Sequence, residues 1–126
     1  MTATEDSTQL RKIQLAATAA LKEFDRICTL LGTRYVIYGG TAIGAARHQG
    51  FIPWDDDVDV CMPREDYERF LAEAPAVIAP AFEVISSRSH PDYPRTFGVL
   101  GLVGSTFVPG VARNLSFRMP LGIDLF

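Results

Sequence analysis

The sequence predicts a domain of the α+β class, with a mixed central sheet flanked by helices and an amphipathic helix at the N-terminus. Helical periodicity dominates the first half of the chain, whereas β-rich segments dominate the second half. The composition, 48% hydrophobic and 21% charged, is that of a globular protein, and 126 residues suffice for one domain with a buried core. We therefore expect a single domain over residues 1–126.

The first helix is predicted over residues 9–31, where apolar side chains recur at spacings of three and four. Asp6 with Gln9 resembles a capping box, and Gly32 supplies a stop signal. These signals predict a long amphipathic helix at the start of the chain.

A short strand over Tyr35–Tyr38 leads into Gly39 and Gly40, and Thr41 is the predicted N-cap of a helix that reaches Gln49 and ends at Gly50. A helix start offers unpaired N–H groups, and glycines let the backbone approach a phosphate closely. A plain strand-to-helix turn accounts for the same residues. A Walker loop and a dinucleotide fingerprint are both excluded: no Lys-Ser/Thr follows, and Thr41 stands at the middle glycine position.

An acidic run ends in a predicted strand, Asp57–Met62. Side chains alternate along a strand, so Asp57 and Asp59 should point the same way. Two neighbouring carboxylates repel each other, and a hard cation such as Mg²⁺ relieves that repulsion. The alternative is a solvated acidic loop, which the neighbouring Trp54 and the apolar strand make less attractive.

A calcium-binding loop is the other metal site that this run suggests, because Asp55, Asp57 and Asp59 match its first, third and fifth positions. Val60 stands where that loop needs glycine, and Asp66 replaces the final glutamate. An EF-hand is therefore not expected.

The remaining elements are a helix opened by Pro63 and ended near Pro75, and β-rich segments at 82–87, 96–108 and 111–118. The last segment, Leu121–Phe126, places Asp124 alone among apolar residues. A buried carboxylate needs a partner or a metal ion, whereas an exposed acid at a chain end needs neither, and the sequence leaves both readings open.

Charge and cysteine content limit the possible partners and compartment. The net charge of −3 offers no basic surface for a nucleic-acid polymer. Cys28 and Cys61 read as small buried hydrophobes, which fits a reducing cytoplasm. Without a signal peptide or an apolar run of spanning length, a cytoplasmic protein is expected, and peripheral association with the inner face of a membrane stays compatible. The oligomeric state is not indicated.

Two stretches together carry a resemblance to a known family, and they read YGGTAIGAARHQGFIPWDDDVDV (38–60) and MPREDY (62–67). They resemble the signature of the LicD family, which belongs to the nucleotidyltransferase (polymerase-β-like) superfamily and includes phosphocholine transferases and fukutin-related proteins. About thirty residues carry the resemblance. Family members are usually longer, so the chain is expected to be truncated at its C-terminus.

The resemblance implies a nucleotidyltransferase-like fold and a site for phosphoryl transfer. It implies that Gly39 and Gly40 hold the donor phosphate, and that Asp57, Asp59 and Asp124 are catalytic and ligate two Mg²⁺ or Mn²⁺ ions. The implied donor is a CDP-linked small molecule such as CDP-choline. The implied acceptor is a hydroxyl of a glycan or lipid-linked sugar, as in lipopolysaccharide or teichoic acid synthesis.

Other residues are candidates for supporting roles. Thr41, Arg47 and His48 are candidate contacts to the donor phosphates, Trp54 is a candidate for stacking on a base or a choline cation, and Asp55 with Asp56 would orient the metal ligands. A solvated helix end and a packed tryptophan are the plainer readings. Two other functions remain open: transfer of a nucleotide from an NTP, and a non-catalytic domain that binds a nucleotide or a partner.

Overall fold

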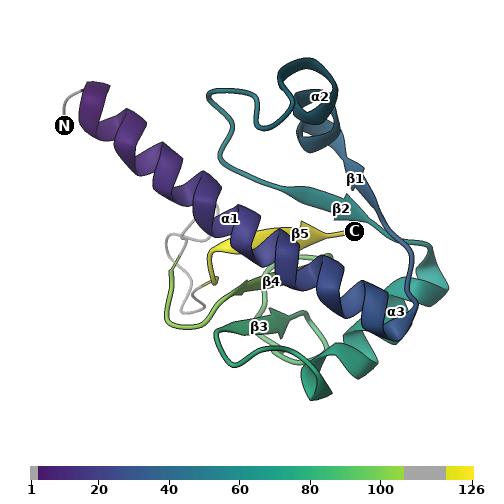
Figure 1. Cartoon of the computed structure of the whole chain (residues 1–126). Coiled ribbons are helices and arrows are strands. Elements are labelled where there is room, and N and C mark those ends of the chain that lie inside the picture. The colour runs from purple at the N-terminus through teal and green to yellow at the C-terminus, as the bar shows by residue number, and fades with distance from the viewer. Residues whose placement is uncertain (1–2, 107–118) are drawn as a thin grey trace.

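The described part of the chain, residues 3–106 and 119–126 of a computed structural model, contains three α-helices and a five-stranded sheet (Figure 1). The elements are α1 (Ala3–Leu31), β1 (Val36–Tyr38), α2 (Gly39–His48), β2 (Asp59–Cys61), α3 (Arg64–Glu73), the 3₁₀ turn η1 (Ala74–Ala76), β3 (Phe82–Ile85), β4 (Gly98–Leu102) and β5 (Gly122–Leu125). The α+β class and the N-terminal helix are confirmed. The predicted segment 111–118 lies outside the described residues.

The sheet is mixed, with the strand order β1-β2-β5-β4-β3. The β2–β5 pair is parallel, and the other three neighbouring pairs are antiparallel. This order brings the last strand of the chain, β5, to the centre of the sheet, between β2 and β4. Residues that are far apart in the sequence therefore become neighbours on β2 and β5.

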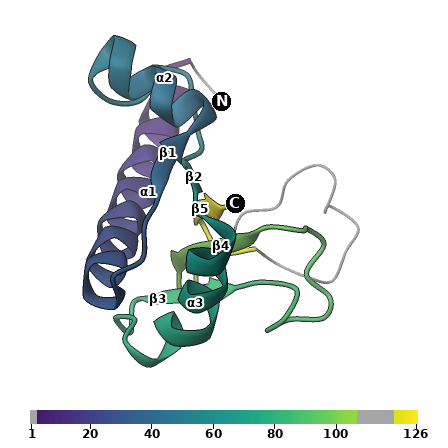
Figure 2. The same ribbon diagram turned by 90° about the vertical axis from the view of Figure 1, so that its right-hand side faces the viewer.

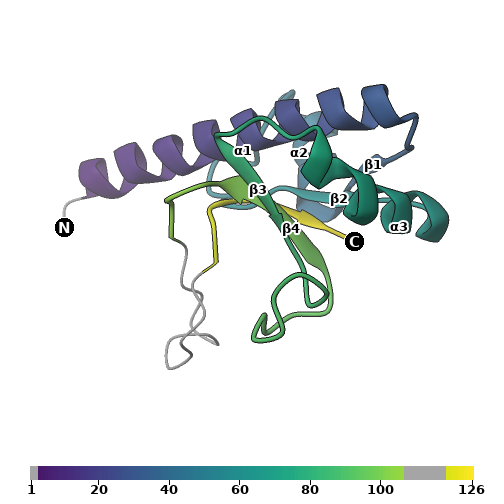
Figure 3. The same ribbon diagram turned by 90° about the horizontal axis from the view of Figure 1, so that it is seen from below.

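Helix α1 covers one face of the sheet (Figures 1 and 3). Its buried side chains, Ala17, Ala20, Phe24 and Ile27, belong to one core cluster with Val60, Leu100, Ile123 and Leu125 of the central strands. A smaller cluster, Ile85, Tyr93, Val99 and Met119, is separate from that core. Because side chains alternate along a strand, residues between the core positions of β2 and β5 face away from α1.

Helix α1 ends where the sequence predicts but begins earlier. The helix begins at Ala3, six residues before the predicted start, so Asp6 lies in its first turn and does not begin a capping box. Glu5 and Asp6 there complement the positive end of the helix dipole. At the other end Gly32 adopts a φ of +71°, and the Thr33 N–H donates to the Cys28 carbonyl, as expected for a glycine stop.

Helix α2 begins three residues earlier than predicted, at Gly39, with Tyr38 and not Thr41 as its N-cap. Thr41 is therefore inside the helix and not its cap. No side chain caps this helix start, and its C-cap is Gln49 in the left-handed region, one residue before the predicted Gly50. The prediction failed because Gly39 reaches a φ of +59°, which starts the helix directly after β1.

The other elements match their predictions with shorter bounds. Strand β2 covers only Asp59–Cys61, so Asp57 belongs to the preceding loop. Helix α3 has Pro63 as its N-cap and is followed by η1, which contains Pro75. Seen edge-on in Figure 2, the strands lie between α1 and the loops that precede β4. None of the helices in the described residues combines the length and apolarity needed to cross a bilayer.

Candidate active site

Asp59 and Asp124 lie side by side at the centre of the sheet. They are register partners on the parallel strands β2 and β5, and the Asp124 N–H donates to the Val58 carbonyl at 2.9 Å. Their neighbours Val60, Ile123 and Leu125 are fully buried in the core beneath α1. Strand alternation therefore places both carboxyl groups on the opposite face of the sheet.

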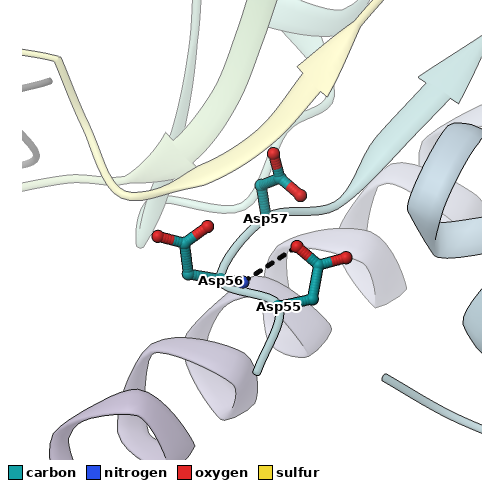
Figure 4. A group of neighbouring side chains, drawn as sticks. All are labelled: Asp55, Asp56 and Asp57. Atoms are coloured by element: carbon teal, nitrogen blue, oxygen red, sulfur yellow. Dashed lines mark hydrogen bonds between the residues drawn. The ribbon is translucent and has the colours of Figure 1, made fainter. Parts of the chain in front are cut away.

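Three further acids form a compact group just before β2. The carboxylates of Asp55, Asp56 and Asp57 offer oxygen atoms that all lie within 4.8 Å of one another (Figure 4). The Asp56 N–H donates to Asp55 Oδ1 at 3.0 Å, and Gln14 of α1 donates through Nε2 to the Asp55 carbonyl at 2.9 Å. These contacts hold the irregular loop in place, and the bond from Gln14 ties it to α1.

The electrostatics of the acids show how closely they are packed. Burial raises the pKa of Asp57 to about 7, aided by a hydrogen bond with Asp55 and the charge of Asp59. Burial and the charge of Asp59 raise the pKa of Asp124 to about 6. Burial also raises the pKa of Asp59, although its hydrogen bond with Asp124 opposes that shift. Holding these groups ionised therefore costs free energy unless positive charge is nearby.

The diglycine turn lies against the same acids. A Cβ atom added at Gly39 would lie 3.8 Å from Asp59 Oδ2, and one added at Gly40 would lie 2.9 Å from Asp55 Oδ2. The Thr41 hydroxyl accepts the N–H of Asp59 at 3.0 Å, which ties the first turn of α2 to β2. The structure thus brings together the two segments that the sequence selected, the Gly-Gly turn and the acidic run.

Comparison with known proteins bears on this arrangement. Residues 32–90 match the family described as LicD/FKTN/FKRP, nucleotidyltransferase domain. The matched segment, just under half of the chain, is thus similar to the LicD family. This segment contains the diglycine turn and the acids of residues 55–59, whereas Asp124 follows it in the chain.

Three curated proteins are similar to parts of the chain. The lipopolysaccharide cholinephosphotransferase LicD of Haemophilus influenzae is 50% identical over 62 residues, which are 49% of this chain and 23% of that protein. An uncharacterized protein of Rickettsia prowazekii is 38% identical over 64 residues, 46% of this chain and 24% of that protein. The human ribitol 5-phosphate transferase FKRP is 54% identical over 35 residues, 28% of this chain and 7% of that protein. The matches thus cover a quarter or less of each relative.

Other predicted residues of the matched segment lie farther from the acids. Arg47 and His48 are exposed in the last turn of α2, at the opposite end of the helix from the diglycine turn. Two helical turns, about 11 Å, separate their backbone from Gly40. The structure does not bring them into the acidic group, and their contact with the donor stays a prediction. Trp54 is 78% exposed directly before the acids, so it is not the packed tryptophan of the plainer reading.

The acids suit a divalent cation. Carboxylate oxygens are the ligands that Mg²⁺ and Mn²⁺ prefer, and a bound cation would favour the ionised forms of Asp57, Asp59 and Asp124, which burial disfavours. Within the described residues, however, the compact group of three is Asp55, Asp56 and Asp57, not the predicted trio. Asp57 joins this loop group to the Asp59–Asp124 pair, since the charge of Asp59 acts on it.

One residue of this site was missed at the sequence level. Arg95 lies in the loop before β4 and lines a small cavity of about 40 Å³ together with Asp56, Asp57 and Asp124. Its charge opposes the rise in the pKa of Asp124. The local sequence Pro-Arg-Thr-Phe has no spacing that relates it to the acids, so only the folded chain reveals this position.

Proposed function

We propose that this chain provides the donor-binding and cation-binding part of a phosphotransferase. In this proposal it moves phosphocholine, or a related phosphorylated alcohol, from a CDP-linked donor to a hydroxyl group of a glycan or lipid-linked sugar. The supporting observation is the Asp59–Asp124 pair, which lies beside the diglycine turn of the segment that matches the LicD family. Two of the relatives are named as transferases of choline phosphate and of ribitol 5-phosphate, and both groups are phosphorylated alcohols.

In the proposed site, Asp57, Asp59 and Asp124 hold one or two Mg²⁺ or Mn²⁺ ions, and Asp55 with Asp56 orients them. Such ions supply charge neutralisation for the donor phosphates and for the developing charge of the reaction. The N–H groups of Gly39 and Gly40 point out of the first turn of α2, where a helix start favours an anion. The exposed ring of Trp54 offers a face to the base or to the choline cation.

The proposed reaction is a displacement at phosphorus. The acceptor hydroxyl oxygen forms a bond to the phosphorus that carries choline, while the bond from that phosphorus to the bridging oxygen breaks. CMP leaves with the electron pair of the broken bond. The hydroxyl proton passes to a carboxylate of the site, for which Asp124 is our candidate because it lies at the centre of the sheet beside Asp59.

Calorimetric binding of CDP-choline tests the proposal. We expect binding to require Mg²⁺ or Mn²⁺, and Asp57→Ala and Asp59→Ala each to weaken it by at least tenfold, because each removes a charged ligand. Asp6→Ala is the matched control, since this exposed acid lies in the first turn of α1. Binding that ignores both the metal ion and the two site variants would contradict the proposal.

The released product separates the proposed reaction from transfer of a nucleotide. With a CDP-linked donor and a glycan acceptor we expect CMP, whereas transfer of a nucleotide from an NTP releases pyrophosphate. A chain that binds donor but releases neither product with any acceptor would be a binding domain. The matches cover a quarter or less of each relative, so the activity of the whole relatives is a proposal for this chain.

A further inference from the structure

Arg95 lies beside the acids of the candidate site. It lies in the loop between β3 and β4 and shares the small cavity with Asp56, Asp57 and Asp124. Its Nε–H is buried and has no hydrogen-bond partner among the described residues. The five arginines with ion pairs in the described structure are Arg26, Arg34, Arg64, Arg69 and Arg88. Arg95 is thus a half-buried cation whose donors are not committed to a carboxylate.

A stack of aromatic rings holds Arg95 in position. Its Cζ atom lies 5.1 Å from the centre of the Phe97 ring, and the Phe97 ring lies 4.6 Å from that of Phe126. The Phe126 ring in turn lies 5.5 Å from that of Tyr38, the N-cap of α2. A guanidinium that packs its face on a ring keeps its N–H groups in the plane free for an anion.

The diglycine turn and Arg95 lie on opposite sides of the Asp59–Asp124 pair. Across the sheet, Tyr38, Asp59, Asp124 and Val99 are consecutive register partners on β1, β2, β5 and β4. The diglycine turn follows Tyr38 directly, whereas Arg95 lines the same cavity as Val99. A diphosphate bound over the acids would therefore have backbone N–H groups on one side and a planar fork of donors on the other.

We propose that Arg95 binds the phosphate that is transferred, opposite the diglycine turn. This inference rests on the proposed function, because it assigns the guanidinium to the donor's diphosphate. Arginine matches phosphate oxygens in a bidentate manner, and the missing partner of the Nε–H is supplied when that phosphate arrives. The plainer role, in which Arg95 only offsets the charge of the acids, makes a different prediction for binding of the metal ion.

Two probes separate these roles: Mn²⁺ alone, and inorganic pyrophosphate in the presence of Mg²⁺. We expect Arg95→Ala and Arg95→Gln to weaken pyrophosphate binding by about tenfold to a hundredfold, and Arg95→Lys to weaken it less. The same variants should bind Mn²⁺ as tightly as the unchanged protein or more tightly, because a positive charge has left the site. Arg88→Ala is the matched control. Arg88 lies in the same loop as Arg95, but its guanidinium pairs with Glu68 of α3.

Pyrophosphate binding by Arg95→Ala within twofold of the unchanged protein would overturn the inference. So would the absence of pyrophosphate binding by the unchanged protein, and so would a parallel loss of Mn²⁺ and pyrophosphate affinity, which indicates a structural role. CDP-choline binding that depends on Asp57 but not on Arg95 leaves the proposed function intact and rejects the inference. Pyrophosphate binding that depends on Arg95, without binding of any CDP-linked donor, rejects the proposed function and leaves Arg95 as a diphosphate contact only.

Discussion

Asp59 and Asp124 are register partners on the adjacent parallel strands β2 and β5, so two acids lie side by side in the middle of the sheet. Two neighbouring carboxylates that are both ionised repel each other, so the pair is most stable when one of them keeps its proton. Burial is the main cause of the raised pKa values of both residues, and the charge of Asp59 raises the pKa of Asp124 further. A pair that is unfavourable as two anions is therefore sensitive both to pH and to any bound cation.

The first prediction concerns pH. An acid whose pKa is higher in the folded chain than in the unfolded chain stabilises the fold below its ordinary pKa, and this contribution is lost as pH rises through the folded value. The pKa of Asp124 is raised to about 6 and that of Asp57 to about 7. We expect the melting temperature of the metal-free protein to fall between about pH 4 and pH 7, with a loss on the order of 2 kcal/mol for Asp124.

Asp124→Asn should flatten this pH profile, because an amide keeps the shape of the side chain without a charge. Thermal denaturation in a chelating buffer at pH 4, 5, 6 and 7 measures the effect. Mg²⁺ should raise the melting temperature of the unchanged protein at pH 7 more than that of Asp124→Asn. If the melting temperatures of the two proteins fall equally with pH, the charge of Asp124 does not cause the pH dependence.

The second prediction concerns the diglycine turn. Gly40→Ala should weaken binding of Mn²⁺ with little loss of stability, because the new Cβ would lie 2.9 Å from Asp55 Oδ2, the far end of a flexible side chain. Gly39→Ala should instead cost about 1 kcal/mol or more of stability, since Gly39 has a φ of +59°. Gly50→Ala is the control, because a Cβ there meets nothing within 4 Å. Unchanged Mn²⁺ affinity in Gly40→Ala would contradict the prediction.

Local sequence patterns predicted the acids of this site better than they predicted its geometry. Alternation around Val58 and Val60 correctly indicated that Asp57 and Asp59 lie close together, although Asp57 turned out to precede the strand. The sequence placed Asp124 alone among apolar residues of a strand, and the structure places it on β5 beside Asp59. Its register with Asp59 depends on a parallel pairing between distant segments, which no local pattern specifies.

The roles of Thr41 and Arg95 could not be predicted from the sequence, for physical reasons. Thr41 has the residue type of a helix cap, but its hydroxyl accepts a tertiary hydrogen bond from Asp59 and the helix starts before it. Arg95 belongs to a loop whose course depends on packing against the sheet, so periodicity carries no information about it. In both cases the missing information is a contact between segments that are far apart in the chain.

The third prediction tests the contact between Thr41 and Asp59. Thr41→Val keeps the shape of the side chain but removes the acceptor of the Asp59 N–H, so we expect a loss of about 1–2 kcal/mol in the free energy of unfolding and weaker Mn²⁺ binding. Thr41→Ser should restore both, because it keeps the hydroxyl. Thr18→Val is the matched control, since the Thr18 hydroxyl donates only to the Gln14 carbonyl within α1. Urea denaturation measures the free energy of unfolding, and calorimetric titration measures the Mn²⁺ affinity. If Thr41→Val matches Thr18→Val in both quantities, this hydrogen bond does not position Asp59.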